Sequence, residues 1–547
     1  MYTYNNMIFP IKLPENEPVY TYEKESLDRV KLKETLNATL NDFIEIPVII
    51  NGKEIYTGNT IEVRLPHNKN KIIGKCHLAG KKEIEEAIKC SLETAKSWSE
   101  MPYQQRALIF LKAADLLTLK YRYLMNAVTM LSISKTPYQS EIEAVCELAD
   151  FWRFNVFGMH NIYREQPPYS PKGTYNFTEY RPLEGFVLAI TPFNFTSIAG
   201  NLPTAPVIMG GATLWKPASS AVYAPYMIMR ILKEAGLPDG VINFLPSKGS
   251  VISEVTLNNP YFAGLHFTGS TEVFNNIWKI CANNIGRYKN YPRIVGETGG
   301  KDFIVIHNSA NIDAAVTGII RGAFEYQGQK CSAASRLYIS ESIWPQLKEK
   351  LLDEIKTIKM GDVLDFSNFM NAVIDKGAFD KIKSYIDYAK NSNEAEILIG
   401  GNCNETTGYF IDPTVILTTN PEFKTIKEEI FGPVVTAYVY KDEAYEEMLE
   451  LCDHASPYGL TGAIFAEDTT IILKTLQKLK YTAGNFYIND KPTGAIVGQQ
   501  PFGGSRASGT NDKSGTFINL LKWTSPRAIK VNLVSPLNYR YPFMTEK

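Results

Sequence analysis

The chain has 547 residues, of which 44% are hydrophobic and 21% are charged, with 57 basic against 58 acidic side chains. This length predicts two or three domains, and the composition is typical of a folded globular protein rather than a disordered or fibrous one. The net charge of -1 gives no electrostatic reason to expect nucleic acid or an anionic membrane as partner. No apolar run approaches the roughly 18 residues that span a bilayer.

The seven cysteines lie far apart and form no CxxC pair, and the six histidines are equally scattered. Neither a zinc site nor a thioredoxin-type redox site is therefore indicated, and we expect no metal. The odd number of cysteines and their wide spacing favour free thiols in a reducing compartment. The first residues, MYTYNNMIFPIKLPENEP, contain no arginine and no long apolar run, so they do not look like a usual targeting signal. The sequence therefore leaves both the cytosol and the mitochondrial matrix open as the compartment of this protein.

Apolar residues at helical spacing predict an amphipathic helix over residues 81–98, and more helix follows to about residue 155. Its predicted apolar face consists of Ile84, Ala87, Ile88, Leu92, Ala95 and Trp98. The composition then changes, because residues 166–182 are rich in Pro, Tyr and Thr, and this predicts extended structure. A second extended stretch is expected at 528–543, and the two together are expected to form a separate β-flap.

From residue 186 onward, short apolar strands alternate with helical segments, which predicts a doubly wound parallel α/β sheet. A second series of the same kind begins at residue 303, so two α/β blocks are expected to meet near residue 297. The predicted strands are FVLAI (186–190), TLWK (213–216), VINFL (241–245), GLHF (264–267) and FIVI (303–306). The predicted helices are 221–235, which ends at Gly236, and two others near 311–328 and 341–358.

One cysteine, Cys331, lies among small and polar residues in the stretch QGQKCSAASR, 327–336. A cysteine that only packs usually lies in an apolar run, whereas a reactive thiol must be reached by its substrate. The metal and disulfide interpretations have little support from the rest of the chain. A packing residue and a nucleophile remain the two alternatives at this point.

Two polar residues follow predicted strands and are candidate partners for that thiol. Glu297 lies between glycines in GETGGK, 296–301, and Asn194 lies in ITPFNFT, 190–196. Each also has an ordinary explanation: an incidental acid in a surface turn, and a turn residue that bonds its own backbone. A carboxylate base and an amide donor would suit nucleophilic catalysis if the fold brought them to Cys331.

Two further segments are candidates for binding a ligand. FTGST (267–271) can present backbone amides and hydroxyls to a phosphate at a helix start, although the chain has no GxGxxG fingerprint. The glycine-rich stretch TGAIVGQQPFGGSRASGT (493–510) is either a flexible connector or a loop whose backbone amides hold a carboxylate.

These motifs, in this order and at this spacing, resemble the aldehyde dehydrogenase superfamily from about residue 40 to residue 530. The resemblance implies an aldehyde dehydrogenase-like fold with two doubly wound domains and a β-flap oligomerisation element. GQKCSA, NFYIND and GAIVGQQPFGG are similar to the members that oxidise L-glutamate γ-semialdehyde, the open form of 1-pyrroline-5-carboxylate, to L-glutamate in proline catabolism. The motifs that carry it are FNF (193–195), WKP (215–217), FTGS (267–270), GETGGK (296–301), GQKCSA (328–333), EEIFGP (428–433), YGLTGA (458–463), NFYIND (485–490) and GAIVGQQPFGG (494–504).

The resemblance implies roles for individual residues. Cys331 matches the nucleophile, Glu297 the base that activates water, and Asn194 a donor to the oxyanion. The residues that match the NAD site are Lys216, Gly269, Ser270, Glu429 and Phe431, with Ser219 standing where many members have a Glu. That replacement leaves the strictness of the choice of NAD over NADP open. The residues that match the substrate site are Phe195, Ser332, Gly494, Ala495 and Phe502.

The resemblance also implies an organisation for the chain. Residues 1–165 and 183–296 are expected to form the NAD-binding domain, and 297–507 the catalytic domain. Residues 166–182 and 508–547 are expected to form the oligomerisation flap and C-terminal tail of a homodimer or an assembly of dimers. The mitochondrial matrix is the implied compartment, with the cytoplasm as alternative. The rival interpretations are a dehydrogenase for another short semialdehyde and a catalytically silent relative; a Cys peptidase is disfavoured because no histidine lies in a comparable motif.

Overall fold

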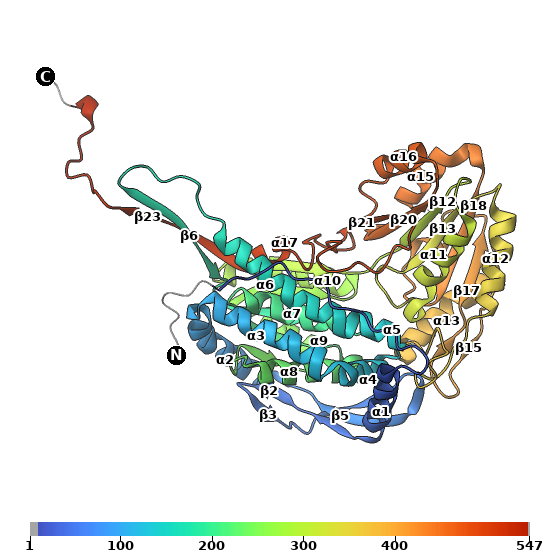
Figure 1. Ribbon diagram of the computed structural model, residues 1–547, viewed down its shortest axis with the longest axis horizontal. Coiled ribbons are helices and arrows are strands. Elements are labelled where there is room, and N and C mark those ends of the chain that lie inside the picture. The colour runs from blue at the N-terminus through green and yellow to red at the C-terminus, as the bar shows by residue number, and fades with distance from the viewer. Residues whose placement is uncertain (1–8, 545–547) are drawn as a thin grey trace.

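The computed structural model describes residues 9–544 and contains two seven-stranded sheets, each covered by helices (Figure 1). The first sheet has the order β11-β10-β7-β8-β9-β2-β3, and its first five strands are parallel. β2 runs antiparallel to both of its neighbours. The strands are β2 (Val48–Ile50), β3 (Lys53–Ile55), β7 (Phe186–Ile190), β8 (Ala212–Lys216), β9 (Ile242–Phe244), β10 (Phe262–Thr268) and β11 (Arg293–Glu297).

Alternate residues of these strands pack against helices on opposite faces, as the period of a strand requires. Val187 and Ala189 of β7 join one hydrophobic cluster, while Phe186 and Leu188 join the other. The covering helices are α2 (Lys81–Glu100), α3 (Tyr103–Asp115), α4 (Arg122–Ile133), α6 (Leu148–Arg164), α7 (Thr196–Ile208), α8 (Tyr223–Ala235), α9 (Gly249–Thr256) and α10 (Thr271–Asn283).

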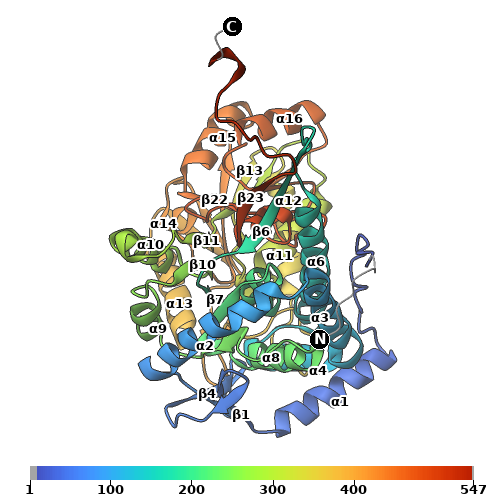
Figure 2. The ribbon, with the colours of Figure 1, turned by 90° about the vertical axis from the view of Figure 1, so that its left-hand side faces the viewer.

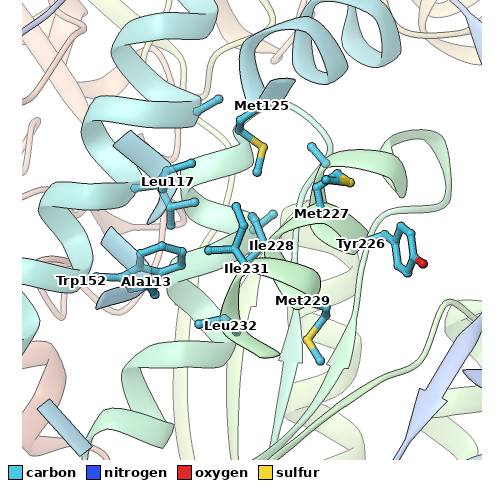
Figure 3. Close-up of a cluster of buried hydrophobic side chains, with 14 of the residues drawn as sticks. Ala113, Leu117, Met125, Trp152, Tyr226, Met227, Ile228, Met229, Ile231 and Leu232 are labelled. Carbon is cyan, nitrogen blue, oxygen red and sulfur yellow. The ribbon is translucent and has the colours of Figure 1, made fainter. Parts of the chain in front are cut away.

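The larger of the two clusters lies between helices that come from distant parts of the chain. Figure 3 shows Trp152 of α6, Met125 of α4 and Ile231 of α8 pointing toward one another. Trp152, Ile231 and Leu232 are each 0% exposed. A buried aliphatic side chain contributes about 1.5–3 kcal/mol, so this cluster fixes α6 and α8 against the sheet that carries the site.

The second sheet has the order β14-β17-β18-β13-β12-β20-β21, and all of its neighbours are parallel except the edge pair β14 and β17. Its strands are β12 (Asp302–Ile306), β13 (Ala334–Ser340), β14 (Ala395–Ile399), β17 (Thr414–Thr418), β18 (Val434–Tyr440), β20 (Thr461–Phe465) and β21 (Asn485–Ile488). Its helices are α11 (Ile312–Phe324), α12 (Trp344–Lys356), α13 (Lys376–Lys390), α15 (Tyr445–His454) and α16 (Thr469–Lys478).

A two-stranded antiparallel ribbon projects from the body of the molecule (Figure 1), and Figure 2 shows it from the side on which it projects. It pairs β6 (Thr174–Pro182) with β23 (Thr524–Asn532) along their full length. The prediction that the two extended segments pair is confirmed, but the bounds of the second are wrong. β23 begins before residue 528 and ends at Asn532, because its partner β6 begins opposite it at Thr174, directly after Gly173, which has a positive φ.

Other predicted elements agree with the structure to within a few residues. FVLAI is β7 without change, the helix expected at 81–98 is α2, and Gly236 ends α8 with a φ of +103°. The helix expected near 311–328 is wrong at its end, because α11 stops at Phe324. Tyr326 and Gln327 have φ values of +51° and +56°, which no α-helix accommodates.

The remaining N-terminal elements lie at the bottom of Figure 1, where β1 (Ile44–Ile46), β5 (Asn68–His77) and β4 (Thr60–Leu65) form a small sheet and α1 (Leu27–Asn41) packs on α4. Residues 9–22 precede them without regular secondary structure. The N-terminal segment MYTYNNMIFPIKLPENEP, which does not look like a usual targeting signal, lies partly outside the described residues. Within residues 9–544, no helix has both the length and the apolar character to cross a membrane.

Candidate active site

The candidate residues from the first sheet lie at one edge, because parallel strands bring their carboxyl ends together. Ile190 is paired with Lys216 at the ends of β7 and β8, and Thr268 is paired with Glu297 at the ends of β10 and β11. Asn194 follows β7 by four residues. The loops after these strands therefore meet above the sheet, as expected for a ligand-binding edge.

The loop before Cys331 has an unusual backbone that distant residues hold in place. Tyr326, Gln327 and Gly328 all have positive φ, and two of them are not glycine. Such a conformation costs about 1–3 kcal/mol per residue and persists only where the surroundings impose it. The Gln327 amide nitrogen donates to the carbonyls of Ser134 (3.1 Å) and Ala372 (2.8 Å). The strained turn is thus tied to two separate segments and aims the following residues at the site.

Cys331 itself is 9% exposed, and the candidate amide donor bonds to the loop that precedes it. The Asn194 side chain donates to the carbonyl of Gln329, two residues before Cys331, at 3.1 Å. Burial raises the pKa of the Cys331 thiol, and the carboxyl groups of Asp302, Glu297 and Glu429 raise it further, while its own backbone amide acts in the opposite direction. The structure therefore brings Asn194 to the thiol loop, which the sequence alone did not show.

Glu297 is the last residue of β11, where the sequence had placed it in a turn. Its carboxylate accepts a hydrogen bond from the backbone amide of Gly504 at 3.1 Å. Burial raises the pKa of this carboxyl well above its usual value, and the Gly504 amide and the charge of Lys513 oppose the shift. A carboxyl group with a raised pKa is a stronger base when ionised, which suits proton transfer from water.

One cavity of about 490 Å³ joins the candidate catalytic and substrate residues. Ser332 is buried in its wall, and its hydroxyl is 2.8 Å from the hydroxyl of Thr493, at the start of the 493–502 loop. Five phenylalanine residues also line it, so charged and apolar surfaces face the same space. The sequence-predicted residues in its wall are Phe195, Glu297, Cys331, Ser332, Gly494, Ala495 and Phe502.

The backbone amides of Gly494 and Ala495 are available to a ligand. Gly494 has a φ of +94°, and among the described residues of the chain no group accepts a hydrogen bond from either amide. Gly494 is exposed and Ala495 is half-buried. Two neighbouring unpaired donors in a cavity wall form a place for an anionic oxygen.

The residues that matched a nucleotide site lie outside this cavity, but they also gather at strand ends. Lys216 ends β8, and burial lowers the pKa of its ammonium group to about 8. Ser270 caps the amino end of α10, accepting from the Val273 amide at 3.3 Å, and Gly269 precedes it. Ser219 begins an exposed 3-10 turn after β8.

Glu429 and Phe431 come from the second sheet's side of the molecule. The Glu429 carboxylate accepts from the Gly300 amide at 2.9 Å, and a side chain at Gly299 would collide with it. Phe431 has a φ of +63° and packs edge-on against Phe193, with ring centres 5.9 Å apart. A helix amino terminus, a lysine and a carboxylate at strand ends fit the phosphates and hydroxyls of a dinucleotide.

Several side chains that the sequence did not single out also line the cavity. Glu143 is buried there and Glu147 is half-buried, and the Lys135 ammonium lies 2.9 Å from the Glu143 carboxylate and 4.1 Å from the centre of the Phe195 ring. Thr493 is a further wall residue. A run of four acids in EIEAVCELAD, 141–150, was the available signal, but in isolation it reads as the polar side of a helix.

We expect the turnover number to rise with pH through the raised pKa of Glu297. Below that pKa the carboxyl carries a proton and takes none from water, so the rate falls as the pH falls. The measurement is kcat from about pH 5 to about pH 9 at saturating substrate, compared with Glu297→Gln. A wild-type profile that is flat over this range would contradict the assignment.

Comparison with known proteins agrees with this geometry. The model of the aldehyde dehydrogenase family matches residues 55–529. The chain therefore belongs to the aldehyde dehydrogenase family, as the motifs had indicated, and it has the fold of that family.

Individual relatives show which members of the family the chain is similar to. The chain is 51% identical over 538 residues to the mitochondrial delta-1-pyrroline-5-carboxylate dehydrogenase of Dictyostelium discoideum, an alignment that covers 98% of this chain and 96% of the relative. It is 44% identical over 530 residues to the human protein of the same name, covering 97% and 94%. The crystal structure of the Mycobacterium tuberculosis delta-pyrroline-5-carboxylate dehydrogenase bound with NAD superimposes with a TM-score of 0.95 at 46% identity, covering 99% of this chain and 100% of that one.

Proposed function

We propose that this enzyme oxidises L-glutamate γ-semialdehyde, formed from 1-pyrroline-5-carboxylate, to L-glutamate with NAD, in the breakdown of proline. The observation that carries the proposal is the single cavity in which Cys331 and Glu297 face the unpaired amides of Gly494 and Ala495. An aldehyde with a carboxylate at its far end has a partner for each end there. The names of the relatives, at 44–51% identity, agree with this substrate.

In the first half of the reaction, the Cys331 thiolate adds to the aldehyde carbon, and the carbonyl oxygen becomes an oxyanion. The Asn194 amide and the Cys331 backbone amide are the proposed donors to that oxygen. NAD, when bound, would supply the acceptor for the hydride that this adduct loses as it becomes a thioester. One hydrogen of the Asn194 amide is bonded to the Gln329 carbonyl, which leaves the second hydrogen of the same nitrogen for the oxyanion.

In the second half, Glu297 takes a proton from a water molecule, and the oxygen of that water attacks the thioester carbon. The carbon–sulfur bond breaks, the acid leaves, and the Cys331 thiolate is restored. The backbone amides of Gly494 and Ala495, with the Ser332 hydroxyl, would hold the substrate carboxylate throughout. Phe195 and Phe502 would pack on its short aliphatic chain, so that the aldehyde points at the sulfur.

For the cofactor, we assign Lys216 to the adenosine ribose, Gly269 and Ser270 to the pyrophosphate, and Glu429 and Phe431 to the nicotinamide riboside. The assignment follows the family match and the position of these residues at strand ends and at the amino end of α10. Residues 1–165 and 183–296 would then form the NAD-binding domain, and 297–507 the catalytic domain. Residues 1–8 of the first segment lie outside the described range.

The test of this function is the formation of reduced nicotinamide with 1-pyrroline-5-carboxylate, measured with NAD and a panel of other short aldehydes. A kcat/KM for 1-pyrroline-5-carboxylate well above those of propanal and succinate semialdehyde supports the proposal. A higher kcat/KM for another semialdehyde would make that compound the better candidate for the substrate. If the enzyme turns over no aldehyde, the alternative that this chain is a catalytically silent relative is favoured.

We expect Ser219→Glu to lower kcat/KM with NADP about tenfold more than with NAD, because a carboxylate beside the adenosine ribose would repel a 2′-phosphate. Ser220→Glu is the matched control, since it adds the same charge to the neighbouring exposed residue. The measurement is the ratio of kcat/KM values for the two cofactors in wild type and both variants. If both substitutions change this ratio equally, the adenosine ribose does not lie beside Ser219.

We further propose that the enzyme is a homodimer, or an assembly of dimers, joined through the β6–β23 ribbon. The ribbon projects from the body, and its apolar side chains Tyr175, Phe177 and Val531 are exposed, as are Leu533 and Val534 directly after it. Light scattering of the wild type against a variant that lacks residues 524–544 tests this. For the compartment we propose the mitochondrial matrix, because relatives in several species are named mitochondrial. Fractionation of the source cells decides between the matrix and the cytosol.

A further inference from the structure

A segment without regular secondary structure, residues 16–22, contacts the substrate cavity from a distant part of the chain; we call it the N-terminal strap. In Figure 1 the dark-blue chain crosses in front of α6 on its way to α1. Asn16, Glu17 and Val19 belong to the cavity wall. The strap therefore lies at the site, although it precedes every motif that identified the family.

Ion pairs and hydrogen bonds hold the strap on α4 and α6. The Glu17 carboxylate pairs with Arg122 at 3.0 Å and with Arg153 at 2.6 Å, and the Glu17 amide donates to Asp150 at 2.9 Å. Arg122 also lies over the ring of Tyr20, 3.7 Å from its centre. These contacts are partly buried, so they are stronger than pairs in open solvent. The strap is accordingly a fixed part of the fold.

The Asn16 side chain joins this fixed segment to the loop that carries Gly494 and Ala495. Its amide nitrogen donates to the Asp150 carboxylate at 2.8 Å and to the Val497 carbonyl at 2.7 Å. Its amide oxygen accepts from the Gln499 side chain at 2.9 Å. Both hydrogens and the oxygen of one amide are therefore used to connect α6 with the 493–502 loop.

The loop needs such support in its middle. At one end, the Thr493 hydroxyl meets Ser332, and near the other end the Asn485 amide donates to the Pro501 carbonyl at 3.0 Å. Between them the loop bonds mainly to itself, for example from the Ile496 amide to the Gln500 side chain at 2.9 Å. The bond to Val497 lies two residues beyond Ala495. Asn16 thus anchors the loop next to the two unpaired amides.

We propose that Asn16 is a positioning residue, which fixes the Gly494 and Ala495 amides at the distance from Cys331 that a carboxylate-bearing semialdehyde requires. The inference rests on the proposed function, because it assigns the substrate carboxylate to those amides. Backbone donors must be held to within a fraction of an ångström to contribute to specificity. A strap contact that is lost would let the loop move, and only substrates that use the loop would be affected.

The test compares Asn16→Ala and Gln499→Ala with the matched control Asn41→Ala, which removes the same side chain from the exposed end of α1. Gln499 is exposed, so its substitution removes a bond to Asn16 without opening the core. Two quantities are measured for each full-length variant. The first is hydrogen exchange of the peptide that covers residues 493–502, and the second is kcat and KM for 1-pyrroline-5-carboxylate and for propanal, which lacks a carboxylate.

We expect Asn16→Ala to speed exchange in this peptide and to raise KM for 1-pyrroline-5-carboxylate about tenfold. The kcat for that substrate and both constants for propanal should stay near the wild-type values, and Gln499→Ala should show the same pattern more weakly. Unchanged hydrogen exchange in this peptide overturns the inference, because it shows that Asn16 does not anchor the loop. Equal losses of activity toward the two aldehydes also overturn it, because they indicate general damage to the enzyme. A wild type that oxidises propanal but not 1-pyrroline-5-carboxylate overturns the proposed function instead, and the exchange data then still decide whether Asn16 holds the loop.

Discussion

Cys331→Ala is expected to lower NAD-dependent oxidation of 1-pyrroline-5-carboxylate by at least about 10⁴-fold, because no other group is placed to form the covalent adduct. Within the described cavity wall, the other thiol is Cys146, and it is bonded to the strap through the Pro18 carbonyl and to Glu141. The measurement is the rate of reduced-nicotinamide formation in steady state and in a single turnover.

The matched control is Cys403→Ala, since Cys403 is a half-buried free cysteine in the short strand β15 (Cys403–Asn404) and does not belong to the described cavity wall. It should leave kcat within about twofold of the wild type, as surface substitutions usually do. The thiol of Cys331 should also be the one whose alkylation by iodoacetamide removes activity. Retained turnover in Cys331→Ala would mean that the chain does not use covalent catalysis at this residue.

Glu297→Gln is expected to separate the two halves of the reaction and to lower kcat by about 10²–10⁴-fold, which is the usual contribution of a general base. Glutamine keeps the size of the side chain and can still accept from the Gly504 amide, but it takes no proton from water. Adduct formation and hydride loss do not need this base. A rapid-mixing experiment should therefore show a burst of one reduced nicotinamide per site, followed by slow turnover.

A carboxylate away from the site provides the control for that experiment. Glu254 is exposed on α9 and pairs with Lys81, so Glu254→Gln removes the same charge where no chemistry occurs. It should show wild-type kinetics without an isolated burst. A Glu297→Gln enzyme that loses the burst as well would assign Glu297 to adduct formation, and the order of steps proposed here would be wrong.

The elements that were predicted well owe their structure to local patterns. β7 and the end of α8 were both placed to the residue, the first by its unbroken apolar run and the second by Gly236, which alone among neighbouring residues adopts positive φ at little cost. The alternation of strands and helices likewise predicted the doubly wound sheets. Each of these signals needs only neighbours in the chain.

The errors arose where distant residues decide the conformation. The helix expected near 311–328 ends at Phe324 because Gln327 is held in a left-handed conformation by the carbonyls of Ser134 and Ala372. β23 ends at Asn532 because β6 offers no further partner. Neither cause is visible in the residues of the element itself.

The sequence by itself determined the class of enzyme and its candidate nucleophile, base and oxyanion donor, because chemical motifs are short and carry their residue types in a fixed order. Tertiary structure alone decided that Asn194 lies against the Cys331 loop, that Glu297 is desolvated beside Gly504, and that Asn16 supports a loop 481 residues further along the chain. The physical reason is that hydrogen-bond partners, burial and the pKa values that follow from burial depend on groups that pack together in space, and separation along the chain does not constrain them.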